Sequence, residues 1–155
     1  MSTATLNSPA LTDEAAILAV LDNLSEAHFK KNTSLFAEQF APAAAIFNLA
    51  PPLSHHGVNR SEKQAWFDSW ATPITIEPRD FKVNISGDLA FAYGYLHLAG
   101  TKKGTESAVS FWMRETLCLQ RQGSGEWQIV HEHASVPFYM DGTLRPAFDL
   151  QPEQN

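Results

Sequence analysis

The sequence predicts an α+β fold in which three N-terminal helices pack on a strongly bent antiparallel sheet. Two observations support this prediction. Apolar residues recur at helical spacing up to about residue 70, and from Ile74 onward the period of the pattern changes to two. Short loops then join four consecutive strand candidates, so that neighbouring strands can pair directly. With 155 residues, 44% of them hydrophobic, the chain can build one domain with a sizeable core.

The helical part divides into three segments. Thr12 is a candidate N-cap of the first helix, because acidic residues follow it in the first turn. SLFAEQF predicts a second, short helix that stops before Pro42. Asn59 resembles the start of a capping box for a third helix, RSEKQAWFDSW.

The sheet part begins with a short strand candidate, AAIFNL, and a proline-containing loop that carries His55 and His56. Four long strands are expected at about 74–86, 89–99, 107–121 and 126–136. We therefore divide the chain into a flexible N-terminus (1–11), one domain (12–137) and a C-terminal extension (138–155). The extension is too apolar for a free tail, so we expect it to dock on the domain or across a dimer.

Composition narrows the classes of partner and compartment. The formal net charge is −6 with no large basic cluster, so neither nucleic acid nor a membrane is an expected partner. No apolar run reaches the length of a membrane span, and the N-terminus does not resemble a signal peptide. The single cysteine, Cys118, allows no intrachain disulfide, which fits the cytoplasm.

The histidine pair in WQIVHEHAS is the most distinctive feature of the last strand. His131 and His133 are two residues apart, so a regular strand places both rings on one face. If Arg121 pairs with Trp127, regular pairing puts Glu115 opposite His133. A slip of one residue would move the whole set to the other face.

The same parity assigns many aromatic side chains to the histidine face. This face is expected to be the wall of a ligand pocket, closed by the helix that carries Trp66 and Trp70 and by the first helix. Its expected members from the strands include Tyr93, Tyr95, His97, Phe111, Met113, Glu115, His131 and His133.

Three interpretations of the polar group remain open. His131, His133 and Glu115 have the composition of a two-His-one-carboxylate metal site, but the downstream ligands typical of HxH metal folds are missing. His133 and Glu115 alternatively form a general acid–base pair, with Tyr93 or Tyr95 donating to an oxyanion. The third interpretation, which the sequence favours, is a satisfied polar network that lines a cavity. We expect neither a metal nor a cofactor.

The run ETLCLQRQGSGEWQIVHEHASVP resembles the last hairpin of SnoaL-like members of the NTF2-like superfamily. Arg114, Thr116, Trp127, Ile129, His131, His133 and Ser135 occupy the positions of that pattern. The hairpin is also similar to the association domain of calcium/calmodulin-dependent kinase II. The resemblance implies a cone-shaped, cystatin-like α+β barrel with an internal cavity, usually in a homodimer that packs through the sheet.

The resemblance also implies a choice of functions. The superfamily includes ketosteroid isomerase, dehydratases, polyketide cyclases and non-catalytic binding domains. Asn48 stands where ketosteroid isomerase has its catalytic aspartate, and an amide cannot act as a general base. We therefore expect a protein that binds a small apolar or aromatic molecule. It acts either as a cofactor-independent isomerase, dehydratase or cyclase or as a non-catalytic carrier or dimerisation domain.

In the catalytic alternative, His133 is the acid–base group, with Glu115 and His131 beside it. The expected substrate-binding residues are Tyr93, Tyr95, Asn48, Trp66, Trp70, Phe111, Met113 and His97.

Overall fold

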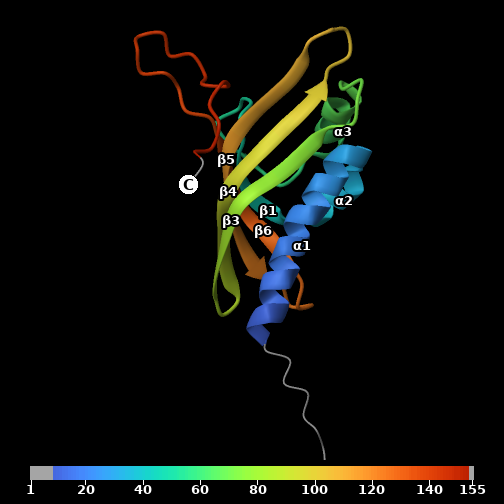
Figure 1. Cartoon of the computed structure of the whole chain (residues 1–155). Coiled ribbons are helices and arrows are strands. Elements are labelled where there is room, and N and C mark those ends of the chain that lie inside the picture. Colours follow the sequence, from blue (N-terminus) through green and yellow to red (C-terminus); the bar gives the residue numbers. More distant parts are fainter. Residues whose placement is uncertain (1–8, 154–155) are drawn as a thin grey trace, which may run out of the picture.

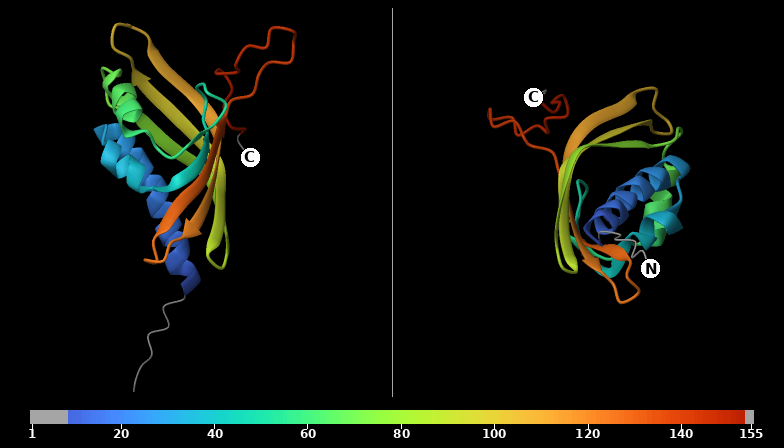
Figure 2. Two further views of the ribbon diagram at one scale, coloured as in Figure 1. Left: turned by 180° about the vertical axis from the view of Figure 1, so that it is seen from behind. Right: turned by 60° about the horizontal axis from the view of Figure 1, so that its bottom comes forward.

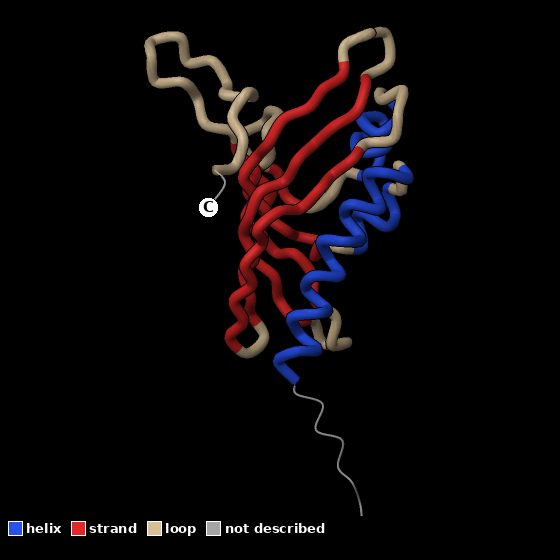
Figure 3. Tube along the Cα trace, viewed as in Figure 1, coloured by secondary structure: helices blue, strands red, loops and turns tan. Residues whose placement is uncertain are grey.

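Six strands form one curved sheet that wraps around the first helix in a computed structural model describing residues 9–153 (Figure 1; Figure 3). The helices are α1 (Pro9–Lys30), α2 (Thr33–Glu38) and α3 (Arg60–Asp68). The strands are β1 (Phe40–Phe47), β2 (His55–His56), β3 (Thr75–Ser86), β4 (Leu89–Thr101), β5 (Ala108–Arg121) and β6 (Trp127–Ser135). The predicted α+β class is confirmed, and the sheet is curved but not closed.

The helix starts follow local capping chemistry. The Asn59 side chain accepts a hydrogen bond from the Glu62 amide at 3.2 Å, as the sequence predicts for the start of α3. Asn32 caps α2 in the same way, by accepting from the Leu35 amide. The expected cap at Thr12 is wrong, because α1 begins three residues earlier, at Pro9. Proline suits the first helical turn, where its missing N–H has no partner to lose.

The strand order is β2-β1-β6-β5-β4-β3, and all neighbours are antiparallel except β1 and β6. β1 is longer than the predicted strand, and the short strand β2, at the two histidines of the loop, was not predicted. Figure 2 shows that α1 lies in the hollow of the sheet, with α2 and α3 at the wider end. The core fills the space between α1 and the concave face.

A β-bulge changes the predicted register of the last hairpin. Arg121 pairs with Trp127 and Leu119 with Ile129, as expected, but the next pair is Cys118 with His131. Val130 is therefore an extra residue in β6, and the sides of all following residues are exchanged. Glu115 pairs with Ala134 rather than with His133, so the predicted contact between Glu115 and His133 is wrong.

The parity assigned to β4 is also wrong. Tyr93, Tyr95 and His97 pair with Thr116, Arg114 and Trp112, which lie on the convex face of the sheet. The concave face of β4 instead carries small and aliphatic residues: Ala90, Ala92, Gly94, Leu96 and Leu98. The loop between β4 and β5 does not show where pairing begins, so parity could not be transferred across it from the sequence.

The C-terminal segment after β6 extends from the side of the sheet opposite the helices (Figure 1; Figure 2). It folds back on itself through a bridge between Phe138 and Pro146. Near its end, Ala147 is buried and the Phe148 ring lies 4.7 Å from that of Phe111. The outer part of this arm (residues 138–146) exposes large apolar side chains, among them Met140 at 86%.

None of the helices in the described part of the chain combines the length and the apolar character needed to cross a membrane.

Candidate functional site

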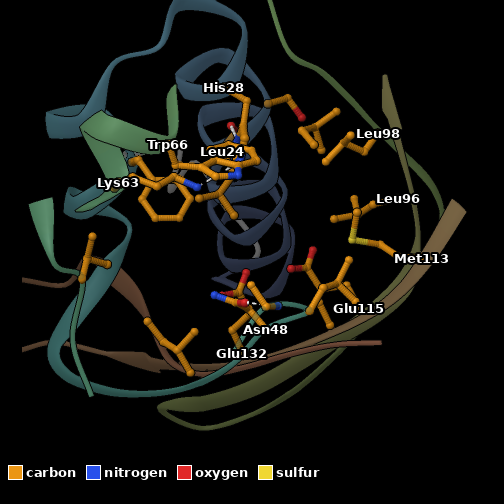
Figure 4. Close-up of a pocket in the computed structure, with 18 of the residues that line it drawn as sticks. Leu24, His28, Asn48, Lys63, Trp66, Leu96, Leu98, Met113, Glu115 and Glu132 are labelled. Atoms are coloured by element: carbon orange, nitrogen blue, oxygen red, sulfur yellow. Dashed lines mark hydrogen bonds between the residues drawn. The ribbon is translucent and has the colours of Figure 1, made fainter. Parts of the chain in front are cut away.

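A cavity of about 450 Å³ lies between the concave face of the sheet and the three helices (Figure 4). Its wall is mostly apolar, and β4 and β5 supply one side while α1 and α3 supply the other. A space of this size and character is typical of small-molecule sites. The apolar wall includes Leu21, Leu24, Phe36, Ile46, Trp66, Trp70, Leu96, Leu98, Phe111 and Met113.

About half of the expected site residues line this cavity. Trp66 and Trp70 come from α3 and the residues just after it, and their ring centroids are 5.5 Å apart. Phe111, Met113 and Glu115 follow one another along the concave face of β5, so they line the cavity although the predicted pairing was wrong. Asn48 also lines it, beyond the end of β1, and its side chain accepts a hydrogen bond from the Ala50 amide at 2.8 Å.

The other expected residues lie on the convex face. His131 Nδ1 is 2.8 Å from the Ala45 carbonyl oxygen, and the His131 ring packs against Phe47. His133 borders a separate hollow beside the loop that follows β1. Because Glu115 faces the other side of the sheet, neither the predicted acid–base pair nor the two-His-one-carboxylate set is assembled.

The aromatic residues expected from β4 are likewise outside the cavity. Tyr93 and Tyr95 are 42% and 37% exposed on the convex face. His97 Nε2 lies 2.8 Å from Ser110 Oγ, and its ring packs on Trp112.

A pair of carboxyl groups occupies the polar end of the cavity. Glu115 is only 4% exposed, and Glu132 lies beside it because the bulge turns Glu132 to the concave face. Burial raises the pKa of Glu115 well above its usual value, and the neighbouring charge of Glu132 raises it further. Both effects favour the protonated form of Glu115.

A lysine and a histidine occupy the helical side. Lys63 Nζ lies 3.3 Å from His28 Nε2, while His28 Nδ1 lies 2.7 Å from the Leu24 carbonyl oxygen. A carbonyl only accepts, so Nδ1 donates to Leu24 and Nε2 presents its lone pair to the lysine. Burial lowers the pKa of His28 to about 3, with a further contribution from the Lys63 charge, so this imidazole is neutral.

Burial also lowers the pKa of Lys63, to about 8, although the carboxyl groups of Glu132 and Glu115 act in the opposite direction. Both Lys63 and His28 line the cavity, and the His28 ring packs against the rings of Phe36, Trp66 and Phe67.

Three buried polar side-chain atoms in the described part of the chain have no hydrogen-bond partner within the protein. They are Ser25 Oγ, Trp70 Nε1 and Glu115 Oε2, and all three residues line the cavity. Unsatisfied buried polar atoms cost about 1–3 kcal/mol each, so their concentration in one place needs a physical reason. A bound molecule with its own polar groups would supply the missing partners.

Sequence reasoning missed Lys63, Glu132 and His28 as site residues. Lys63 had a readable signal, because Trp66 and Phe67 follow it at helical spacings of three and four on the same side of α3. His28 continues the apolar face of the first helix, a position that does not distinguish a site residue from a core residue. Glu132 had no signal, since its orientation depends on the bulge at Val130.

Comparisons with known proteins agree with this architecture. The sequence profile of the SnoaL-like domain matches residues 15–139. No curated protein matches the sequence. Among solved structures, an NTF2-like protein of unknown function from Pseudomonas putida superposes with a TM-score of 0.79 and 26% identity, covering 92% of this chain and 98% of its own.

Two more distant structures share the fold. A putative ketosteroid isomerase from Shewanella frigidimarina has a TM-score of 0.63 and 22% identity, covering 77% of this chain and 94% of its own. A putative calcium/calmodulin-dependent kinase II association domain from Xanthomonas campestris has a TM-score of 0.63 and 18% identity, covering 77% and 84%.

Proposed function

The chain belongs to the SnoaL-like domain family, and from this premise we propose that its cavity binds a small, largely apolar molecule that carries polar groups. The observation that carries the proposal is the position of the three unpartnered polar atoms, all on residues of one apolar cavity. A ligand with a carbonyl or hydroxyl group would satisfy them, while its apolar body would contact the leucine and aromatic wall.

The chemistry that fits this cavity is proton transfer next to a carbonyl, without a cofactor. Glu132 would remove a proton from the carbon beside the carbonyl, and protonated Glu115 would donate a hydrogen bond to the carbonyl oxygen. Two carboxyl groups with different proton affinities are a recurring arrangement in acid–base sites. Returning the proton to another carbon gives isomerisation, and loss of a neighbouring hydroxyl as water gives dehydration.

This proposal assigns the acid–base role differently from the sequence. His133 and His131 were the expected groups, but they lie on the convex face, away from Glu115. Glu115 stays a proposed catalytic residue, now with Glu132 as its partner. Asn48, Trp66, Trp70, Phe111 and Met113 stay proposed ligand contacts, because they line the cavity.

The test uses Glu115→Gln, which keeps the size of the side chain and removes the acid. Isomerisation of 3-cyclohexenone to 2-cyclohexenone is followed by the absorbance of the conjugated product. We expect the variant to lose about 100-fold or more of the wild-type rate, the usual contribution of a general acid or base. Glu126→Gln, in the exposed turn between β5 and β6, is the matched control and should keep the rate.

A binding measurement separates the enzyme from the carrier. Quenching of Trp66 and Trp70 fluorescence by 2-naphthol reports occupancy of the cavity. Saturable quenching without turnover in either protein would support the non-catalytic carrier instead. Absence of saturable quenching would contradict the proposed function itself.

We further propose that a second copy of the chain covers the convex face of the sheet. Phe91, Tyr93 and Tyr95 expose 46%, 42% and 37% of their surface on this face. A contiguous patch of large apolar side chains is typical of a protein interface. The outer part of the C-terminal arm extends beyond the same side of the sheet (Figure 2), where a partner would lie.

A further inference from the structure

Lys63 is the only lysine of the described residues whose amine lies among three aromatic rings. Its Nζ is 3.8 Å from the ring centroid of Phe36, 4.5 Å from that of Trp66 and 4.8 Å from that of Phe67. These rings enclose the amine on the helical side and leave it open to the cavity. An amine held in an apolar enclosure loses part of its hydration, which is one of the ways in which proteins activate lysine as a nucleophile.

His28 accepts a hydrogen bond from the Lys63 amine. Because His28 Nδ1 donates to the Leu24 carbonyl, the lone pair of Nε2 faces Lys63 Nζ at 3.3 Å. A neutral imidazole in this position can orient the amine so that one face points into the cavity.

An acid lies on the other side of the same cavity. Figure 4 shows Lys63 and Glu115 extending into the cavity from opposite walls. Glu115 lines this cavity, and its Oε2 has no hydrogen-bond partner within the protein. A carbonyl compound bound between Lys63 and Glu115 would contact the amine on one side and the carboxylic acid on the other.

We propose that Lys63 captures an aldehyde or ketone in this cavity as a protonated imine. The inference rests on the proposed function, because it needs the cavity to admit a small molecule, and it narrows the ligand class to carbonyl compounds. The lysine nitrogen bonds to the carbonyl carbon and the carbonyl oxygen becomes a hydroxyl. Glu115 protonates this hydroxyl, water leaves, and a C=N bond forms. The proton that the ammonium loses to form the free amine goes to solvent, and solvent returns a proton to Glu115. Overall, an ammonium ion and a carbonyl compound give an iminium ion and water.

The charge balance of the cavity favours this product. The iminium carries the same single positive charge as the ammonium it replaces. The rings of Phe36, Trp66 and Phe67 that hold the ammonium would therefore hold the iminium as well. Glu132, the acidic group that raises the pKa of Lys63 most, attracts the iminium as it attracts the ammonium.

The free amine is accessible near neutral pH. Burial lowers the pKa of Lys63 to about 8, so at pH 8 about half of the molecules carry the unprotonated amine. A lysine with an ordinary pKa of about 10.4 is almost entirely protonated there. We therefore expect Lys63 to react at least about tenfold faster than any other lysine of the chain, after allowing for the weaker nucleophilicity of a less basic amine.

The experiment treats the full-length protein at pH 8 with 2-naphthaldehyde and sodium cyanoborohydride, which reduces an imine to a stable amine. Intact mass shows the number of adducts, and peptide mapping shows their positions. We expect one dominant adduct, at Lys63. Lys63→Arg keeps the positive charge but lacks a nucleophilic amine, and it should abolish that adduct. Lys30→Arg, at an exposed ion pair with Glu26, is the control and should leave the yield unchanged.

The readout does not depend on the variant folding, because the wild-type map alone identifies the modified lysine. Adducts spread evenly over the surface lysines, with none enriched at Lys63, would overturn the inference. Binding of 2-naphthalenemethanol, which has the same ring but no carbonyl, distinguishes the two proposals. If the alcohol quenches tryptophan fluorescence but the aldehyde forms no Lys63 adduct, the proposed imine is contradicted and the proposed binding function stands. If neither compound binds, the proposed function fails too.

Discussion

His28 shows how one buried residue couples the cavity to acid stability. Its pKa is about 3 in the folded protein against an ordinary value of 6.5, so between these values the unfolded chain binds more protons. Stability contributed by this group is therefore present above pH 6.5 and lost as the pH falls toward 3. We expect His28→Gln to flatten the pH dependence of the unfolding free energy in this range by a few kcal/mol, measured by urea unfolding.

The pH dependence of the His28→Gln variant is compared with that of wild type, because Glu115 changes the unfolding free energy with pH in the opposite direction. Its raised pKa stabilises the fold at low pH, and that contribution is lost as the pH rises above its unfolded value of 4.5. His56→Gln, on an exposed residue of β2, is the matched control. A His28→Gln curve that runs parallel to the wild-type curve would show that the neutral state of His28 contributes nothing to stability.

At the scale of elements, a second bulge bends β3 and depends on a glycine in β4. Arg79 pairs with Tyr95 and Lys82 with Tyr93, so two residues of β3 stand opposite Gly94. The Phe81 ring packs directly over Gly94, where an added Cβ would lie 2.6 Å from the ring.

We expect Gly94→Ala to lower the unfolding free energy by about 1–3 kcal/mol, because the methyl group displaces Phe81 and the bulged backbone. Gly123→Ala is the control, since nothing lies within 4 Å of its added methyl group, and it should stay within about 0.5 kcal/mol of wild type. Chemical denaturation of the wild type and the two variants measures the unfolding free energy of each. Equal stability of the two variants would contradict the close contact at the β3 bulge.

The bulge at Val130 also explains how much could be predicted from the sequence. Period and capping patterns found the helices and the four long strands, because they depend on local residue spacing. Asn59 is an example, since its capping bond is made within its own turn. The site was predicted only in part, because the bulge at Val130 shifts the register of β6 against β5, and no local pattern in the sequence reveals it. That shift moved His131 and His133 out of the predicted pocket and brought Glu132 into the cavity.

At the scale of the whole molecule, the sheet separates two surfaces with different roles. The concave face and the helices enclose the cavity, while the convex face carries the exposed aromatic patch. The cavity and the proposed interface share the strands β4 and β5, so Met113 and Trp112 are adjacent in sequence but face opposite sides. Substitutions on the convex face can therefore test assembly without entering the cavity.

The proposed dimer predicts that Phe91→Glu converts the protein to a monomer that still folds. Phe91 is 46% exposed and packs beside Tyr93 with ring centroids 6.2 Å apart, so a charge there would be buried without a partner in the dimer. Light scattering coupled to size exclusion measures the mass. Phe29→Glu, on a residue of α1 that is 56% exposed on the helical side, is the matched control and should leave the mass unchanged.

Truncation after Pro137 tests the arm separately, and it should weaken the dimer or lower the melting temperature if the arm contacts a partner or the domain. A wild-type protein that is monomeric at all concentrations would contradict the interface. A dimer that survives Phe91→Glu would place the interface elsewhere.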